Sequence, residues 1–229
     1  MDYHFEEAAN EEQFTERTVS FLSEYIQAVS EERGVCTLGL SGGSTPKAVY
    51  TELGKQPLDW SRVLLFLVDE RYTAPDSKES NQKLVRDTLL ANADIPEENL
   101  FFPNTTVSLE SCLAGYIQSL IELFNEQPPD IITLGLGEDG HIASLFPPVP
   151  EHAFGEVLAL HTTTDAFAIH DRITVSPLII MAAQAQLLMM RGEKKKHLFG
   201  EIVDSGMDPV RWPLQVALAT GKTTVMYAE

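Results

Sequence analysis

The chain has 229 residues, and 16 basic against 34 acidic side chains give it a formal net charge of −18. So acidic a protein lacks the basic surface that binds nucleic-acid phosphates, and anionic membrane surfaces repel it. We therefore expect neither nucleic acid nor a membrane as a partner. The length and a hydrophobic content of 44% predict a single domain spanning residues 1–229.

The N-terminal residues and the cysteines point to the cytoplasm. The first twelve residues are rich in acids, unlike a secretory signal. The two cysteines, Cys36 and Cys112, have neither the number of a disulfide framework nor the spacing of a metal site. Cys36 lies in an apolar run, where a buried thiol is expected.

The predicted elements alternate along the chain between helices and strands. Helices are expected over residues 11–31, 46–54, 81–91, 109–124, a short stretch from 177, and 193–203. Strands are expected over residues 35–40, 63–68, 131–136, 157–160, 172–175, 187–190, 216–218 and 224–227. Thr45 and Ser80 are expected to cap the helices that follow them. The alternation predicts an α/β fold with a mostly parallel sheet and helices on both faces.

Three polar segments follow apolar strands, and ligands of open α/β sheets bind beyond such strand ends. They are residues 41–46, 69–71 and 137–141. We expect the three segments to converge on one site.

The first segment has the composition of a phosphate-binding loop. Two glycines allow the backbone to approach a ligand, and the N–H groups of a helix N-terminus attract anions. The candidate contacts are Ser41, Gly42, Gly43, Ser44 and Thr45.

The third segment suggests acid–base chemistry. His141 stands in a glycine-flanked loop, where an imidazole can act as general base. Asp139, two residues earlier, is placed to hold the ring in one tautomer.

Other motif-like patterns fit less well. Residues 135–140 match the dinucleotide pattern G-x-G-x-x-G, but prolines at 147, 148 and 150 interrupt the helix that this motif requires. Residues 221–223 resemble the end of a P-loop, but Val216 replaces its first glycine. His161, Asp165 and His170 have no metal-ligand spacing. We expect no metal and no nucleotide cofactor.

In these segments the chain resembles the 6-phosphogluconolactonase family, within the wider glucosamine-6-phosphate isomerase/6-phosphogluconolactonase superfamily. The matching segments are residues 40–46, 68–72, 80–81, 134–147, 172–174, Gly192 and Lys195. The resemblance implies a Rossmann-like α/β fold without metal or organic cofactor. It also implies hydrolysis of 6-phosphoglucono-δ-lactone to 6-phosphogluconate in the pentose phosphate pathway.

The resemblance also implies roles for individual residues. His141 corresponds to the catalytic acid/base, and Asp69 to a carboxylate beside the reacting end of the sugar. The implied phosphate and sugar contacts are Gly42, Gly43, Ser44, Arg71, Arg172 and Lys195. Arg191 departs from the family pattern, so the division of phosphate contacts among Arg71, Arg172, Arg191 and Lys195 stays open. The basic residues at 191 and 194–196 are expected to form a positive island with Arg71 and Arg172.

Two alternative functions remain. The aminosugar-phosphate isomerase/deaminase branch typically has Phe-Asn-Glu-Pro after its histidine motif, whereas residues 144–147 contain no acid, and Arg71 replaces its usual tyrosine. A non-catalytic sugar-phosphate sensor would need neither Asp69 nor His141. The lactonase is therefore favoured, as a monomer or homodimer.

Overall fold

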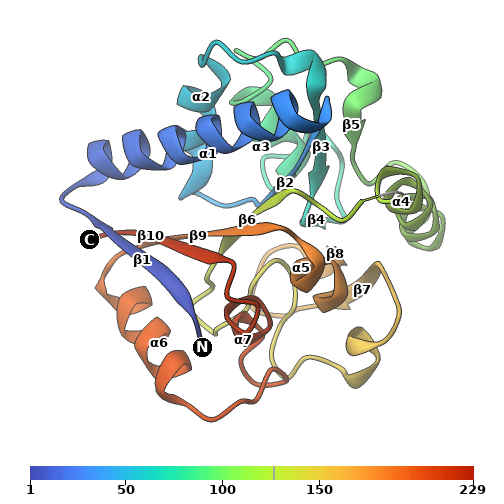
Figure 1. The fold of residues 1–229 in the computed structure, drawn as a ribbon. Coiled ribbons are helices and arrows are strands. Elements are labelled where there is room, and N and C mark those ends of the chain that lie inside the picture. Colours follow the sequence, from blue (N-terminus) through green and yellow to red (C-terminus); the bar gives the residue numbers. More distant parts are fainter. Residues whose placement is uncertain (126) are drawn as a thin grey trace.

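The main sheet of the computed structural model, which describes residues 1–125 and 127–229, has seven parallel strands in the order β1-β10-β9-β6-β2-β3-β5 (Figure 1). They are β1 (Tyr3–Ala8), β2 (Cys36–Leu40), β3 (Val63–Leu67), β5 (Leu100–Phe101), β6 (Ile131–Gly135), β9 (Ala185–Arg191) and β10 (Thr223–Ala228). A smaller antiparallel sheet has the order β4-β8-β7 and contains β4 (Asp69–Arg71), β7 (Ala159–Thr163) and β8 (Asp171–Val175).

Helices cover both faces of the main sheet, as predicted (Figure 1). One face carries α1 (Glu11–Arg33), α2 (Pro46–Gly54) and α3 (Asn81–Asp87). The other carries α4 (Leu109–Leu123), α5 (Pro177–Ala182), α6 (Glu193–Asp204), α7 (Leu214–Leu218) and the small sheet. Short 3-10 turns are η1 (Trp60–Arg62), η2 (Glu97–Asn99) and η3 (Glu151–Phe154).

Neighbouring strand residues pack alternately into the two cores. Leu65 and Leu67 join the cluster under α1 and α2, whereas Phe66 between them joins the cluster under α4. All three side chains are fully buried. Burial of both faces explains why these strands are continuous apolar runs.

Residues 216–218, predicted as a strand, belong instead to helix α7. This prediction was wrong because a short buried apolar run lacks a period that separates helix from strand. Pro213 immediately precedes the helix, at a position where its fixed φ is compatible with a helical start.

The two weaker strands predicted near residues 157–160 and 172–175 exist, as β7 and β8, but they form the separate antiparallel sheet. The strands β1 and β5 were not predicted. The sequence of β1 contains two glutamates, and β5 has only two residues, so neither has a clear apolar pattern.

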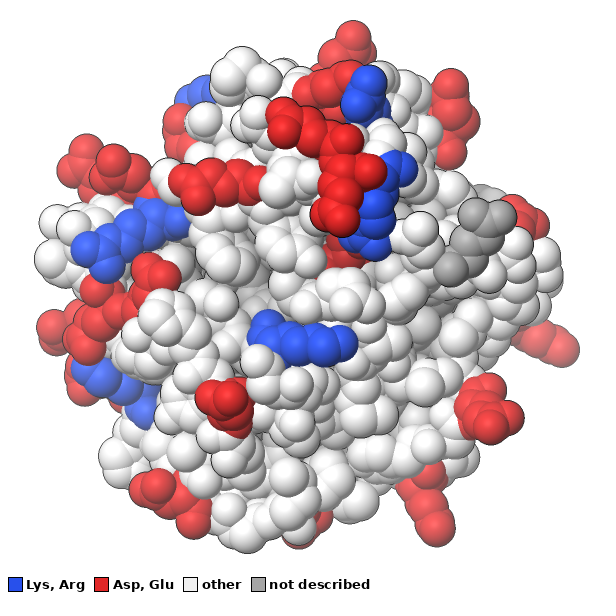
Figure 2. Space-filling view, viewed as in Figure 1, with Lys and Arg blue, Asp and Glu red and all other residues white. Residues whose placement is uncertain are grey.

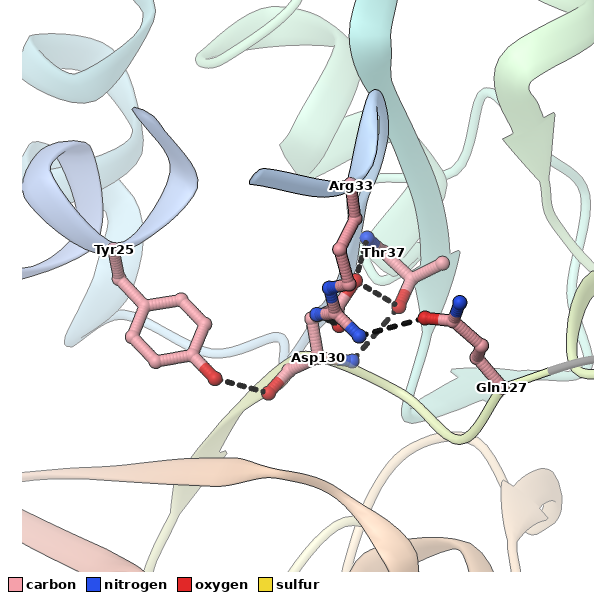
Figure 3. A network of polar contacts seen from close by, with 5 residues as sticks. All are labelled: Tyr25, Arg33, Thr37, Gln127 and Asp130. Carbon is pink, nitrogen blue, oxygen red and sulfur yellow. Dashed lines mark hydrogen bonds and ion pairs between the residues drawn. The ribbon is translucent and has the colours of Figure 1, made fainter. Parts of the chain in front are cut away.

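A buried polar network fastens the strands at their amino ends, opposite the predicted site (Figure 3). Asp130, directly before β6, accepts bonds at one carboxylate oxygen from the Thr37 backbone N–H and hydroxyl, at 2.7 and 3.0 Å. Arg33, at the end of α1, forms an ion pair with the other carboxylate oxygen. The Tyr25 hydroxyl donates to the Asp130 carbonyl at 2.9 Å. Helix α1 and strands β2 and β6 are thus joined at one carboxylate.

One of the two predicted side-chain helix caps and the predicted buried thiol are confirmed. The Ser80 side chain accepts from the Lys83 N–H and caps α3, as predicted. Thr45 occupies the N-cap of α2, but its hydroxyl makes no cap hydrogen bond. Both cysteines are free and buried. Within residues 1–125 and 127–229, no helix is both long and apolar enough to cross a bilayer.

Candidate active site

The three polar segments converge on one cavity of about 510 Å³. It lies beyond the carboxyl ends of β2 and β6 and beside the small sheet. Every predicted site residue lines it: Ser41, Gly42, Gly43, Ser44, Thr45, Asp69, Arg71, Asp139, His141, Arg172 and Lys195. Their roles remain predictions, but their placement makes a common site geometrically possible.

The start of the loop over residues 41–45 is held by two buried hydroxyl groups. The Ser41 N–H donates to the Thr133 hydroxyl at 2.9 Å and to the Tyr50 hydroxyl at 3.1 Å. Burial raises the pKa of Tyr50 to about 12, so its hydroxyl keeps its proton and can donate to the Ser41 carbonyl at 2.9 Å. These bonds fix the start of the loop, while Gly43 and Ser44 remain exposed.

Positions 42 and 43 of the loop both require glycine. A Cβ on Gly42 would lie 1.8 Å from Asn81 Oδ1, and Gly43 has a φ of +95°. A side chain would therefore collide at the first position and strain the backbone at the second.

Asp69, in β4, is a buried carboxylate with two side-chain donors. The Ser144 hydroxyl donates to Oδ2 at 2.6 Å, and the Asn81 amide donates to Oδ1 at 3.2 Å. Ser144 and Asn81 are themselves almost fully buried. The sequence motifs predicted Asp69 as a site residue. Ser144 and Asn81 lie within the same motifs, but no role was predicted for them.

The His141 ring is oriented by Asp139. Its Nδ1 lies 2.5 Å from Asp139 Oδ1, which also accepts from the His141 backbone N–H at 3.1 Å. Burial raises the pKa of Asp139, but the bonds and charge of His141 outweigh this effect and leave the pKa lowered. A Cβ on Gly137 would lie 2.1 Å from Nδ1, so the ring packs directly on that glycine.

The free nitrogen of this ring, Nε2, has no hydrogen-bond partner among the residues that the structure describes. Phe146 and Phe167 flank the imidazole, with ring centroids at 4.8 and 5.6 Å. Asp139 thus holds Nδ1, and Nε2 is available to a substrate or a water molecule.

Three basic side chains line the cavity, together with the carboxylates of Asp69, Glu138 and Asp139. Arg71 and Arg172 are direct neighbours across the β4–β8 pair, and Lys195 approaches from the first turn of α6. In the part of the chain that is described, none of the three forms an ion pair.

The electrostatics of these cations favour an anionic ligand. Burial, and then the charge of Arg71, lowers the pKa of Arg172, and burial lowers the pKa of Lys195. The Arg71 Nε is buried and lacks a hydrogen-bond partner among the described residues. Buried cations are costly unless they are paired, so an anion in the cavity would relieve that cost.

The predicted positive island is smaller than expected. Arg191 forms an ion pair with Glu11 at 2.6 Å, and Lys196 with Glu7 at 2.9 Å. Of the cluster at 191 and 194–196, only Lys195 lines the cavity. On the face drawn in Figure 2, acidic side chains are more frequent than basic ones, in agreement with the net charge of −18.

Residues 1–125 and 127–229 contain no group of three or more His, Cys, Asp or Glu side chains that could hold a metal ion. His161 and His170 instead pair separately with Asp171 at 2.8 Å and Asp165 at 3.0 Å.

Comparison with known proteins agrees with this geometry. The family described as glucosamine-6-phosphate isomerases/6-phosphogluconolactonase matches residues 9–226. The chain belongs to this family. The resemblance predicted from the sequence motifs is therefore confirmed.

Several relatives of this family cover nearly the whole chain. A Dictyostelium discoideum protein named probable 6-phosphogluconolactonase is 38% identical over 223 residues, covering 95% of this chain and 94% of the relative. A Synechocystis 6-phosphogluconolactonase is 33% identical over 219 residues, covering 93% and 90%. The crystal structure of a 6-phosphogluconolactonase from Shewanella baltica has a TM-score of 0.85 at 29% identity, covering 99% and 97%. The predicted α/β fold is confirmed.

Proposed function

We propose that this chain hydrolyses 6-phospho-D-glucono-1,5-lactone to 6-phospho-D-gluconate, a step of the oxidative pentose phosphate pathway. The names of the full-length relatives support this reaction. The observation that carries the proposal is the His141–Asp139 pair, in a cavity that it shares with three basic side chains. Among the described residues, neither His141 Nε2 nor any of the three cations is paired.

In the proposed mechanism, His141 Nε2 takes a proton from water as the water oxygen attacks the lactone carbonyl carbon. The resulting tetrahedral intermediate collapses with cleavage of the bond between that carbon and the ring oxygen. His141 returns its proton to the departing ring oxygen, so no net proton remains on the enzyme. A positioned general base contributes roughly 10²–10⁴ in rate.

The two carboxylates have separate proposed roles. Asp139 holds the imidazole through Nδ1 and stabilises the cation that forms transiently. Asp69, fixed by Ser144 and Asn81, orients the water molecule or a sugar hydroxyl. Each step uses only side chains that line or support the cavity.

Arg71, Arg172, Lys195 and the loop from Ser41 to Thr45 are proposed to bind the phosphate and sugar oxygens. Guanidinium groups suit phosphate because they donate two parallel hydrogen bonds. Arg191 is turned toward Glu11, so we assign it no phosphate contact.

A substrate comparison tests the proposal. Purified protein is given either the lactone or glucosamine 6-phosphate in coupled assays, with correction for spontaneous opening of the lactone. We expect enzymatic clearance of the lactone and no turnover of the aminosugar phosphate. Turnover of the aminosugar phosphate would favour the isomerase/deaminase branch, and binding without turnover of either would favour a sensor.

The two cysteines are free and buried, which fits a reducing compartment such as the cytoplasm. We propose that the protein acts there as a monomer or homodimer.

A further inference from the structure

The loop between β7 and β8 places a large apolar side chain at the cavity. Phe167 is 48% exposed, yet it lines the cavity together with His141 and Arg172. Part of its surface is therefore accessible to a ligand in the cavity.

Phe167 links the proposed base to the proposed anion site. The Phe167 and His141 rings are nearly perpendicular, with a centroid distance of 5.6 Å and an interplanar angle of 83°. It lies 6.1 Å from the Phe146 ring, and the Arg172 guanidinium carbon is 5.5 Å from its centroid. Phe167 thus adds an aromatic ring to a cavity lining that also contains Leu136, Ala143 and Met189.

The loop that carries Phe167 is tied at several points. The Thr164 N–H donates to the His170 carbonyl at 3.0 Å, and the Ala166 N–H donates to the Thr164 hydroxyl at 3.2 Å. His170 also pairs with Asp165 at 3.0 Å. These bonds hold both flanks of the loop, so the aromatic ring is presented to the cavity from a defined backbone.

We propose that Phe167 contacts the substrate and determines specificity by packing on the C–H face of the closed lactone ring. This inference rests on the proposed function. The cations and hydroxyls of the cavity recognise phosphate and hydroxyl oxygens, which lactone and ring-opened product share. Only the closed ring presents a fixed face of C–H groups, whereas the product has rotatable bonds and a new carboxylate.

Packing on an aromatic ring therefore favours the lactone over the product. Covering apolar surface stabilises the complex with the closed ring. The open chain must first lose conformational freedom to make the same contact. Phe167 thus raises affinity for the substrate while leaving the product free to dissociate.

The test compares Phe167→Ala with Phe154→Ala, which truncates another partly exposed phenylalanine that does not line the cavity. We expect Phe167→Ala to raise the KM for the lactone about tenfold, as partial loss of one buried aromatic contact would. The inhibition constant of 6-phosphogluconate should change by less than about twofold, because the product gains little from this contact. Phe167→Tyr should restore the KM, and Phe154→Ala should leave both constants unchanged.

A structural role for Phe167 would give a different result, because a distorted cavity weakens substrate and product together. An unchanged KM in Phe167→Ala, or parallel changes in KM and inhibition constant, would overturn this inference while the wild type still clears the lactone. Absence of lactone clearance by the wild type would instead overturn the proposed function, and this inference with it.

Discussion

Lys195 is a cavity cation whose charge should depend on pH within an accessible range. Burial lowers the pKa of Lys195 below its usual value of 10.5, and Glu138 only partly opposes this effect. The folded protein therefore holds this proton less tightly than a solvent-exposed lysine would. Phosphate binding that depends on Lys195 should weaken as the pH rises through the lowered pKa.

We expect the dissociation constant of 6-phosphogluconate, measured by calorimetry from pH 7 to 10, to increase at the alkaline end. Lys195→Arg should flatten this increase, because a guanidinium remains charged throughout. The phosphate remains a dianion over this range, so the ligand does not account for the change. An equal alkaline increase in wild type and Lys195→Arg would contradict the assignment of Lys195.

At the scale of residues, the predicted cavity-lining set could be read from the sequence because its members lie in short motifs at strand ends. The supporting contacts could not. Ser144 lies 75 positions from its partner Asp69 in the chain, and nothing local to either residue indicates that they meet. Phe167 lies in a loop without a motif, and only the fold places it against His141.

At the scale of elements, the carboxylate of Glu70 in β4 forms hydrogen bonds to the N-terminus of α3. Glu70 Oε1 accepts from the N–H groups of Arg71 and Asn81, both at 2.7 Å. Oε2 accepts from the Gln82 N–H at 2.8 Å and from the Ser80 hydroxyl at 3.0 Å. Burial raises the pKa of Glu70, and these four bonds oppose that rise. The same contacts place Asn81 against Asp69 and Gly42.

Glu70→Gln should therefore reduce both stability and turnover. The amide nitrogen of glutamine would face donors instead of accepting from them, which costs about 1–3 kcal/mol. Displacement of Asn81 should then lower kcat, because Asp69 loses one of its two donors. Denaturant unfolding and lactone kinetics measure the two effects.

Asp130→Asn is the matched control. It weakens a carboxylate network at the amino ends of β2 and β6, whereas the cavity lies beyond their carboxyl ends (Figure 3). It should lower stability and leave kcat unchanged. Unchanged stability and kcat in Glu70→Gln would contradict the role given to Glu70.

Element predictions succeeded where the periodicity was long or the apolar run continuous. Helix α1 has apolar residues at helical spacing over 23 residues, and β3 is apolar throughout. They failed for α7, whose five buried residues carry no period, and they missed β1 and β5. The antiparallel pairing of β7 with β8 was not predicted. Pairing of these strands with each other and with β4 depends on contacts between distant segments, which local sequence patterns do not reveal.

At the scale of the whole molecule, the net charge of −18 coexists with three basic side chains in the lining of one cavity. A like charge about 10 Å from the ligand costs only about 0.4 kcal/mol in water, and salt reduces this further. Arg71, Arg172 and Lys195 instead line the cavity in which the phosphate is proposed to bind, and they lack ion-pair partners among the described residues. An acidic surface disfavours contact with nucleic-acid phosphates without preventing a single phosphate from binding in the cavity.

The most direct test of the account measures lactone clearance above the spontaneous rate for wild type and His141→Ala. The proposed mechanism predicts that the variant loses most of its turnover, by roughly 10²–10⁴, because the general base is absent. Binding of 6-phosphogluconate should persist, since the cations are untouched. Near wild-type turnover in His141→Ala would contradict the account.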